Sequence, residues 1–162
     1  MVKISDIWYY GKSYSEKVIW WFCKIDEKIY QTEEILYKFN FTDEYSIIQS
    51  NCYIPLFKTD IVSLEKEYMQ TLPYNIQKSF DKNFKTNSFD SYDLAFKEFL
   101  DTYSYDFNYS YNWYEFEEKR LKNDAIIWCK QNSINYKNEK RRPQGRFYVL
   151  EQIIKQGRQK AW

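Results

Sequence analysis

The sequence predicts a mostly helical single α+β domain, with an N-terminal β-hairpin packed on a helical bundle. Residues 113–129 carry no Pro or Gly and repeat apolar side chains at helical spacing, which predicts a long helix. Residues 17–23 and 29–32 are rich in β-forming residues and flank the polar segment KIDEK, a pattern typical of a hairpin. Three shorter helical patterns lie between residues 59 and 100, and the long helix is the element around which we expect the others to pack.

The first third of the chain alternates short extended and helical patterns. Residues 2–10 fit a short helix or a short strand. After the hairpin, Thr32 precedes two glutamates and is expected to cap a helix that ends near Asn40. Residues 40–50 are expected to form a loop, and residues 51–57 an extended segment, because a proline disfavours helical backbone in the residue before it.

The middle of the chain predicts three helices before the long one. Thr59 or Asp60 is expected to cap a helix through Thr71, and Pro73 to begin the next. A third helix is expected after Asp90 or Ser91. The segments between these helices, residues 81–88 and 101–110, are polar or irregular and are predicted to be loops. Apolar spacing predicts one more helix at residues 147–156.

Length and charge indicate one domain at residues 1–136 and a basic extension with a short helix at residues 137–162. The chain has 162 residues and a net charge of +1. Residues 90–118 carry eight acids and one base, whereas residues 137–162 carry eight bases and two acids. This separation of an acidic from a basic segment gives information about binding partners and not about the fold. The excess of Lys, Asn, Ile, Tyr and Phe is typical of an AT-rich bacterial or phage genome.

Composition excludes several classes of function. The chain has no histidine, which removes Ser-His-Asp and Cys-His catalysis and His-ligated zinc. Three glycines cannot build a glycine-rich phosphate loop. Cys23, Cys52 and Cys129 are far apart in the sequence and are expected to be buried thiols in a reducing cytosol. Because no apolar run approaches 18 residues and no signal peptide is evident, we expect a cytoplasmic protein without membrane association or cofactor.

Several segments follow one another in an order that is typical of a known family. The long helix has the spacing W-Y-x-F-x4-L-x3-A-I-x-W-C, and upstream come Tyr53-Ile54-Pro55-Leu56, Asp60-Ile61, Tyr68-Met69 and Phe96-Lys97-Glu98. With these motifs the chain resembles Uncharacterised Protein Family 0158 of bacteria, and Ser5-Asp6-Ile7 and residues 28–34 match the opening and the strand-to-helix step of that family. The resemblance covers about residues 3–135 and implies a small α+β domain, with no firmly assigned activity. The arginine-paired stretch of the family is replaced by residues 87–95, and residues after 136 are an addition.

Carboxylates are the remaining catalytic candidates. Glu117-x-Lys119, with Asp101 or Asp106 as a further acid, has half of the metal-binding pattern of restriction-type nucleases. That pattern requires a strand, and on a helix residues i and i+2 diverge. The alternative is a solvated helix face. Glu98 with Asp93 or Asp101 could hold a divalent ion, and here too the alternative is a solvated surface.

Candidate binding residues form two sets. One ring of the pair Trp20-Trp21 is expected to face outward, where it is either a binding anchor or covered by another segment. Aromatic and acidic residues of 90–118 offer a second protein-binding surface. The basic extension has the basic-aromatic mixture that binds nucleic acid, and its alternative is an arm folded onto the acidic surface. The residues concerned are Trp20, Trp21, Asp101, Tyr103, Tyr105 and Asp106 for protein, and Lys137, Lys140, Arg141, Arg142 and Arg146 for nucleic acid.

These observations lead to three functional hypotheses. The first is a non-enzymatic cytosolic interaction protein with an immunity, antitoxin or inhibitor-like role, which acts by binding a protein partner. The second is a nucleic-acid-binding module that uses the basic extension. The third is a carboxylate-metal hydrolase. The oligomeric state does not follow from the sequence.

Overall fold

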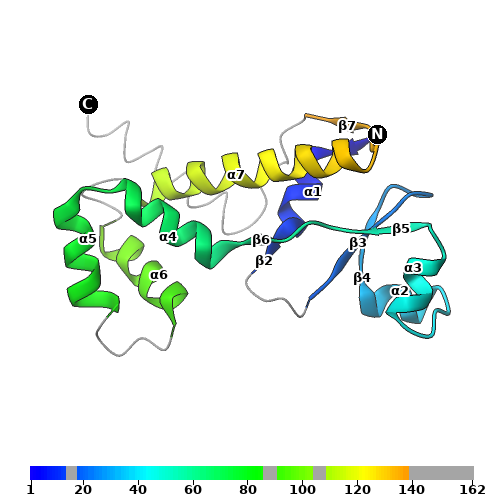
Figure 1. Cartoon of the computed structure of the whole chain (residues 1–162), viewed down its shortest axis with the longest axis horizontal. Coiled ribbons are helices and arrows are strands. Elements are labelled where there is room, and N and C mark those ends of the chain that lie inside the picture. Colours follow the sequence, from blue (N-terminus) through cyan, green and yellow to red (C-terminus); the bar gives the residue numbers. More distant parts are fainter. Residues whose placement is uncertain (14–17, 86–90, 104–108, 139–162) are drawn as a thin grey trace. The chain divides into compact units, whose positions relative to one another are not determined.

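The computed structural model describes residues 1–13, 18–85, 91–103 and 109–138, and these form a mostly helical α+β fold, as the sequence predicts (Figure 1). The chain divides into two compact units. Unit 1 contains Met1–Leu64 and Lys119–Lys140, and the described part of unit 2 falls within Glu65–Glu118. The boundaries lie inside the two helices α4 (Ile61–Thr71) and α7 (Tyr109–Gln131).

The strands of unit 1 are short and form three small sheets. The hairpin of β3 (Trp20–Cys23) and β4 (Ile29–Gln31) is confirmed, and β5 (Tyr53–Pro55) pairs antiparallel with the other edge of β3. Two parallel pairs complete the set. They join β1 (Val2–Lys3) to β7 (Tyr136–Lys137) and β2 (Lys12–Ser13) to β6 (Thr59–Asp60). Helix α1 (Ile4–Gly11) links β1 to β2.

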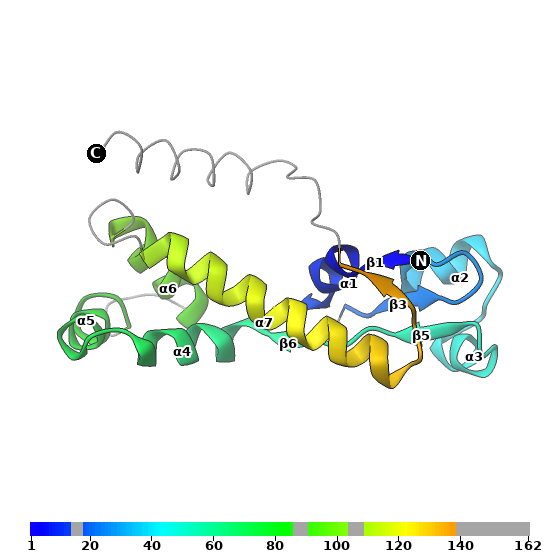
Figure 2. The same cartoon turned by 90° about the horizontal axis from the view of Figure 1, so that it is seen from above.

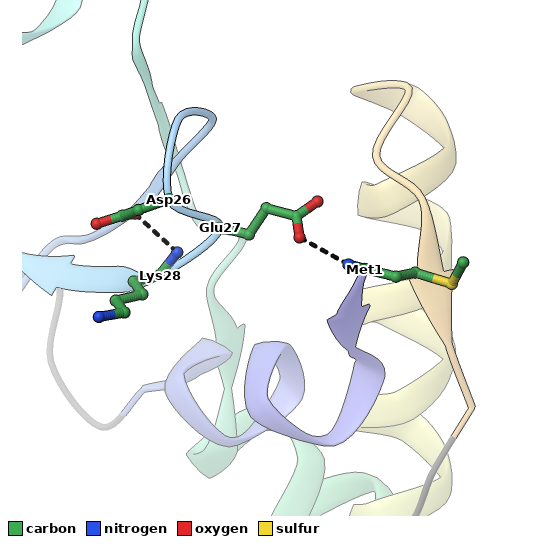
Figure 3. A network of polar contacts seen from close by, with 4 residues as sticks. All are labelled: Met1, Asp26, Glu27 and Lys28. Atoms are coloured by element: carbon green, nitrogen blue, oxygen red, sulfur yellow. Dashed lines mark hydrogen bonds and ion pairs between the residues drawn. The ribbon is translucent and has the colours of Figure 1, made fainter.

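The hairpin turn is fixed by its own polar groups, as Figure 3 shows. The Asp26 carboxylate accepts a hydrogen bond from the Lys28 backbone N–H at 3.0 Å. Glu27 has a φ of 57°, which places it in the left-handed region, and its carboxylate pairs with the Met1 amino group at 2.7 Å. The Asp26 carboxylate also accepts a hydrogen bond from the Tyr30 hydroxyl, so the turn is tied to the following strand.

The last turns of α7 pack on the sheet of unit 1. Trp128 is 6% exposed, and its ring lies edge-on to Phe22 of β3 with centroids 6.0 Å apart. Its indole N–H donates to the Pro55 carbonyl of β5 at 3.1 Å. Ala125 and Cys129 are fully buried in the same core cluster. Trp128 therefore lies on the inner face of the long helix, with Ala125 and Cys129.

Two expectations for residues 32–50 were wrong. Thr32 does not cap α2 (Thr32–Lys38), because its hydroxyl accepts the Trp21 indole N–H at 2.9 Å and the helix has no side-chain cap. Residues 40–50 are not all loop, since they contain the helix α3 (Glu44–Gln49). Asp43 caps α3 and forms a reciprocal capping box with Ser46.

Unit 2 consists of helices with an aromatic core. Besides the C-terminal part of α4 and the N-terminal part of α7 it contains α5 (Tyr74–Phe80), η1 (Asp81–Lys85) and α6 (Tyr92–Tyr103). Helices α4 to α7 are labelled in Figure 2. Phe80, Phe96 and Phe99 are at most 1% exposed and make edge-on and tilted ring contacts. The expected caps are confirmed at Asp60, which accepts from the backbone of α4, and at Ser91, which accepts from the backbone of α6.

The predicted loops around α6 differ from the structure. Residues 81–85 form the π-helix η1 rather than a loop, because Phe84 is buried against Phe80 and Phe99. Helix α6 continues to Tyr103 and α7 begins at Tyr109, so residues 101–110 are helical at both ends. The helix predicted at residues 147–156 lies outside the described residues.

Candidate functional site

Exposed apolar side chains concentrate on α2 and α3. Four of the large hydrophobic residues that are exposed in the described chain fall within a twelve-residue stretch. They are Tyr37 at 88%, Phe39 at 44%, Tyr45 at 68% and Ile48 at 53% exposure, and together they are called the α2–α3 surface below. Tyr45 and Ile48 are three residues apart and share one face of α3.

The α2–α3 surface stands on a small, closed core. Ile35 of α2 and Ile47 of α3 are fully buried against Trp21 of β3. Each isoleucine is two residues from an exposed tyrosine, and at helical spacing this separation turns the two side chains to opposite sides. The buried isoleucines therefore hold Tyr37 and Tyr45 outward.

A row of aromatic rings connects the α2–α3 surface to the sheet. Phe39 lies edge-on to Tyr30 of β4 at 5.6 Å, and at 6.2 Å from Tyr53 of β5, which also contacts Phe41. The hydrogen bond to Asp26, followed by burial, raises the pKa of Tyr30 to about 12. Burial raises the pKa of Tyr53 to about 12. Both phenols are therefore neutral at physiological pH and pack as uncharged rings.

The charge around the α2–α3 surface is negative. Residues 32–50 contain four acids and one base. Glu33, Asp43 and Glu44 are exposed, and so is the single base, Lys38. Exposed aromatic side chains with an acidic rim match a basic partner surface better than an acidic one.

A second feature is a group of buried acids in unit 2. Glu65 of α4 is 1% exposed and Glu117 of α7 is 2% exposed. Asp93 of α6 accepts a charge-assisted hydrogen bond from Lys97 at 2.9 Å. Within the described residues, Oε1 of Glu65 and Oδ1 of Asp93 are buried oxygens without a hydrogen-bond donor. Glu65, Asp93 and Glu117 are together called the carboxyl cluster below.

The carboxyl cluster favours a neutral Glu65. Burial, then the negative charge of Asp93 and a hydrogen bond with it, raise the pKa of Glu65 from 4.5 to about 9. Glu117 raises it further and Lys97 lowers it. In the described part of the chain, no group of three or more His, Cys, Asp or Glu side chains is arranged to hold a metal ion.

The structure separates the two tryptophans of the predicted binding pair. Trp21 is 2% exposed and packs in the core with Ile35 and Ile47, so it is the ring of the pair that faces inward. Trp20 is half-buried and its ring packs on Tyr10 at 4.5 Å. Of the alternatives for the outward ring, partial cover by another segment is the one observed.

The other predicted binding residues are dispersed or outside the described chain. Asp101 is exposed on α6, whereas Tyr103 is half-buried against Phe99 at 5.1 Å. Lys137 lies half-buried in β7. Tyr105, Asp106, Lys140, Arg141, Arg142 and Arg146 lie outside the described residues, so their roles stay predictions.

The described residues of the nuclease-like pattern differ in their exposure. Glu117 is buried, although the sequence placed it on the solvated face of the long helix, while Lys119 and Asp101 are exposed. Asp93 pairs with Lys97 and adjoins Glu65. Glu98 is exposed on α6. The hydrolase hypothesis itself stays a prediction.

Sequence reasoning missed both features described above, although signals for them exist. The spacing of Asp43 and Ser46 is that of a capping box and marks the start of α3. Glu65 occupies the i+4 position after Ile61, and Glu117 the i+4 position after Trp113. Both acids therefore lie on apolar helical stripes, a position that favours burial.

Comparisons with known proteins do not place the chain in a group. Neither the family models nor the curated proteins nor the solved structures contain a match to it. The resemblance to Uncharacterised Protein Family 0158 therefore stays a prediction. Within the part of the chain that the structure describes, no helix combines the length and the apolar character needed to cross a bilayer.

Proposed function

We propose that this chain is a non-enzymatic interaction protein that binds a protein partner through the α2–α3 surface. The observation that carries the proposal is the exposure of Tyr37, Phe39, Tyr45 and Ile48 within twelve residues. Clusters of exposed apolar side chains with a polar rim mark interaction surfaces in soluble proteins. An immunity, antitoxin or inhibitor-like role is consistent with binding as the whole activity.

The chemistry of these side chains supports binding by a few anchors. Tyrosine is enriched among the residues that dominate binding energy, because it offers a large rigid area with a polar end. Tyr37 and Tyr45 stand on helices whose inner isoleucines are fully buried, so the backbone that carries the two tyrosines does not have to be ordered on binding. The α2–α3 surface is thus organised before any partner arrives.

The rim indicates the chemistry of the partner. Glu33, Asp43 and Glu44 are exposed beside the aromatic anchors. Exposed charges of one sign mainly accelerate and orient association with a surface of the opposite sign. We therefore expect a partner with a basic surface around an apolar centre, and an association rate that falls as salt increases.

A matched pair of double variants tests the proposal. Tyr45→Ser/Ile48→Ser removes side chains of 68% and 53% exposure from α3. Tyr74→Ser/Leu94→Ser removes side chains of 70% and 51% exposure from unit 2 and is the control. Proteins from the native host are captured on immobilised wild-type chain and on both variants, and the dissociation constant of each captured protein is measured after purification.

The two variants should differ sharply. Truncation of a binding anchor costs about 2 kcal/mol or more, which raises the dissociation constant about thirtyfold. An increase of at least about tenfold for the α3 variant is therefore the result that supports the proposal. The control should bind like the wild type. Equal affinities of the wild type and the α3 variant, or a loss only in the control, would refute the assignment to α2 and α3.

Photo-crosslinking locates the partner-binding surface by an independent measurement. A photoreactive phenylalanine analogue replaces Tyr37, which is 88% exposed, or Tyr74, which is 70% exposed. The partner should crosslink at position 37 and not at position 74. The reverse pattern would move the binding surface to unit 2.

A further inference from the structure

We propose that Glu65 is a built-in proton site of unit 2, which holds α4, α6 and α7 together while Glu65 is protonated and loosens them when it ionises. The partners of this site come from three helices. Glu65 belongs to α4, Asp93 and Lys97 to α6, and Glu117 to α7. This device is independent of the α2–α3 surface, which belongs to unit 1.

The geometry requires a proton between Glu65 and Asp93. Glu65 is 1% exposed, so water does not solvate a negative charge on its carboxyl group. In the described chain its Oε1 and the Asp93 Oδ1 are both buried without a donor, although the two carboxyl groups are within hydrogen-bonding reach of each other. Two carboxylates offer only acceptors, whereas a protonated Glu65 donates to Asp93 and satisfies both groups.

The surrounding charges act on Glu65. Asp93, which receives a charge-assisted hydrogen bond from Lys97 at 2.9 Å, faces Glu65 from α6. Glu65 faces that negative charge and the buried Glu117. From α6, Tyr92 also adjoins Glu65, and burial followed by the charges of Glu65 and Asp81 raises the pKa of Tyr92, so its phenol is neutral. Lys66 of α4 lies over the Tyr92 ring, 5.3 Å from its centroid.

Ionisation of Glu65 places two facing carboxylates in a nearly dry site. The released proton goes to solvent, and the hydrogen bond to Asp93 becomes a repulsion between like charges. Water that enters the site would solvate both carboxylates and weaken their repulsion. Entry of water requires α4 to move away from α6 and α7. The pKa of about 9 places this event in the mildly alkaline range.

The sign of the effect on stability follows from proton counts. Between pH 4.5, the ordinary value for Glu, and about pH 9, the folded state holds a proton on Glu65 that the unfolded state has lost. Stability from this group is therefore fully present below pH 4.5 and is lost as pH rises toward 9. One proton corresponds to about a tenfold increase in the unfolding constant per pH unit.

The test compares four full-length proteins in denaturant titrations from pH 5.5 to 9.5. Glu65→Gln mimics the protonated acid, because its amide donates to Asp93. It should be the most stable protein at pH 8–9 and should lose the pH slope of the wild type. Asp93→Asn should shift the slope to lower pH. Glu67→Gln changes an exposed acid of the same helix and should retain the wild-type slope.

Two further measurements distinguish the proton from other occupants. Infrared spectra at pH 7 should show the carbonyl stretch of a protonated carboxyl group, and Glu65→Gln should remove it. Mg²⁺, Mn²⁺ or Ca²⁺ at pH 8 should leave the midpoint of unfolding unchanged. The proposal is overturned if Glu65→Gln keeps the wild-type slope, if the carbonyl band is absent, or if a divalent cation stabilises the wild type but not Glu65→Gln.

Discussion

The substitution Trp128→Ala tests the packing of α7 on the sheet of unit 1. Trp128 is 6% exposed, contacts Phe22 and Phe57, and donates to the Pro55 carbonyl. Truncation of a buried tryptophan to alanine costs about 3–5 kcal/mol. Loss of its hydrogen bond adds about 1 kcal/mol. Because domains are stable by about 5–15 kcal/mol, we expect a loss of about 4–6 kcal/mol and a partly unfolded protein at 25 °C.

Urea titration followed by far-ultraviolet circular dichroism measures this loss without relying on tryptophan emission. Trp128→Phe is the control, because it keeps a ring beside Phe22 and loses the N–H donor. It should cost about 1–3 kcal/mol through the smaller ring and the unsatisfied Pro55 carbonyl. A cooperative Trp128→Ala protein whose stability falls by less than about 1 kcal/mol would refute the packing of α7 on β3 and β5.

Three shorter predictions follow from individual contacts. Asp43→Ala should remove the capping box of α3 and lower unfolding free energy by about 1 kcal/mol in a chemical denaturation experiment. At pH 8 a thiol reagent should label the half-buried Cys52 before Cys129, because burial raises the pKa of Cys129 to about 11; equal rates would contradict this burial. Any affinity for random oligonucleotides should fall steeply between about 50 and 200 mM salt and disappear when three arginines become glutamate, while unchanged binding in this variant would assign the contact elsewhere. The arginines are Arg141, Arg142 and Arg146.

The elements that the sequence predicts correctly have strong, local signals. The long helix carries an uninterrupted apolar stripe, and the hairpin carries β-forming residues on both sides of a polar turn. The caps at Asp60 and Ser91 are polar side chains next to apolar helical patterns. In each case neighbouring residues determine the conformation, so no knowledge of distant contacts is needed.

The short helix α3 and the turn η1 depend on contacts that the sequence does not reveal. Helix α3 has only six residues, which is too short to show a clear period, and Ile47 is buried by Ile35 and Trp21 from other elements. Similarly, Phe84 lies in a polar segment and is drawn into the core by Phe80 and Phe99. The α2–α3 surface was missed because its anchors depend on these helices.

The carboxyl cluster was missed for a different reason. Its signal, the position of Glu65 and Glu117 on apolar helical stripes, is present in the sequence, but the usual exposure of acidic side chains to solvent favours the opposite prediction. Glu65 and Glu117 lie on apolar stripes, yet an acid is usually assigned to water because an isolated buried charge is costly. That assignment holds for one acid considered alone. Glu65 of α4 and Asp93 of α6 can share one proton and so avoid the cost of a second buried charge, while Lys97 pairs with Asp93. An acid that interrupts an apolar stripe is therefore best considered together with the acids of neighbouring helices, and the proton that we propose between Glu65 and Asp93 would allow unit 2 to fold with carboxyl groups in its interior.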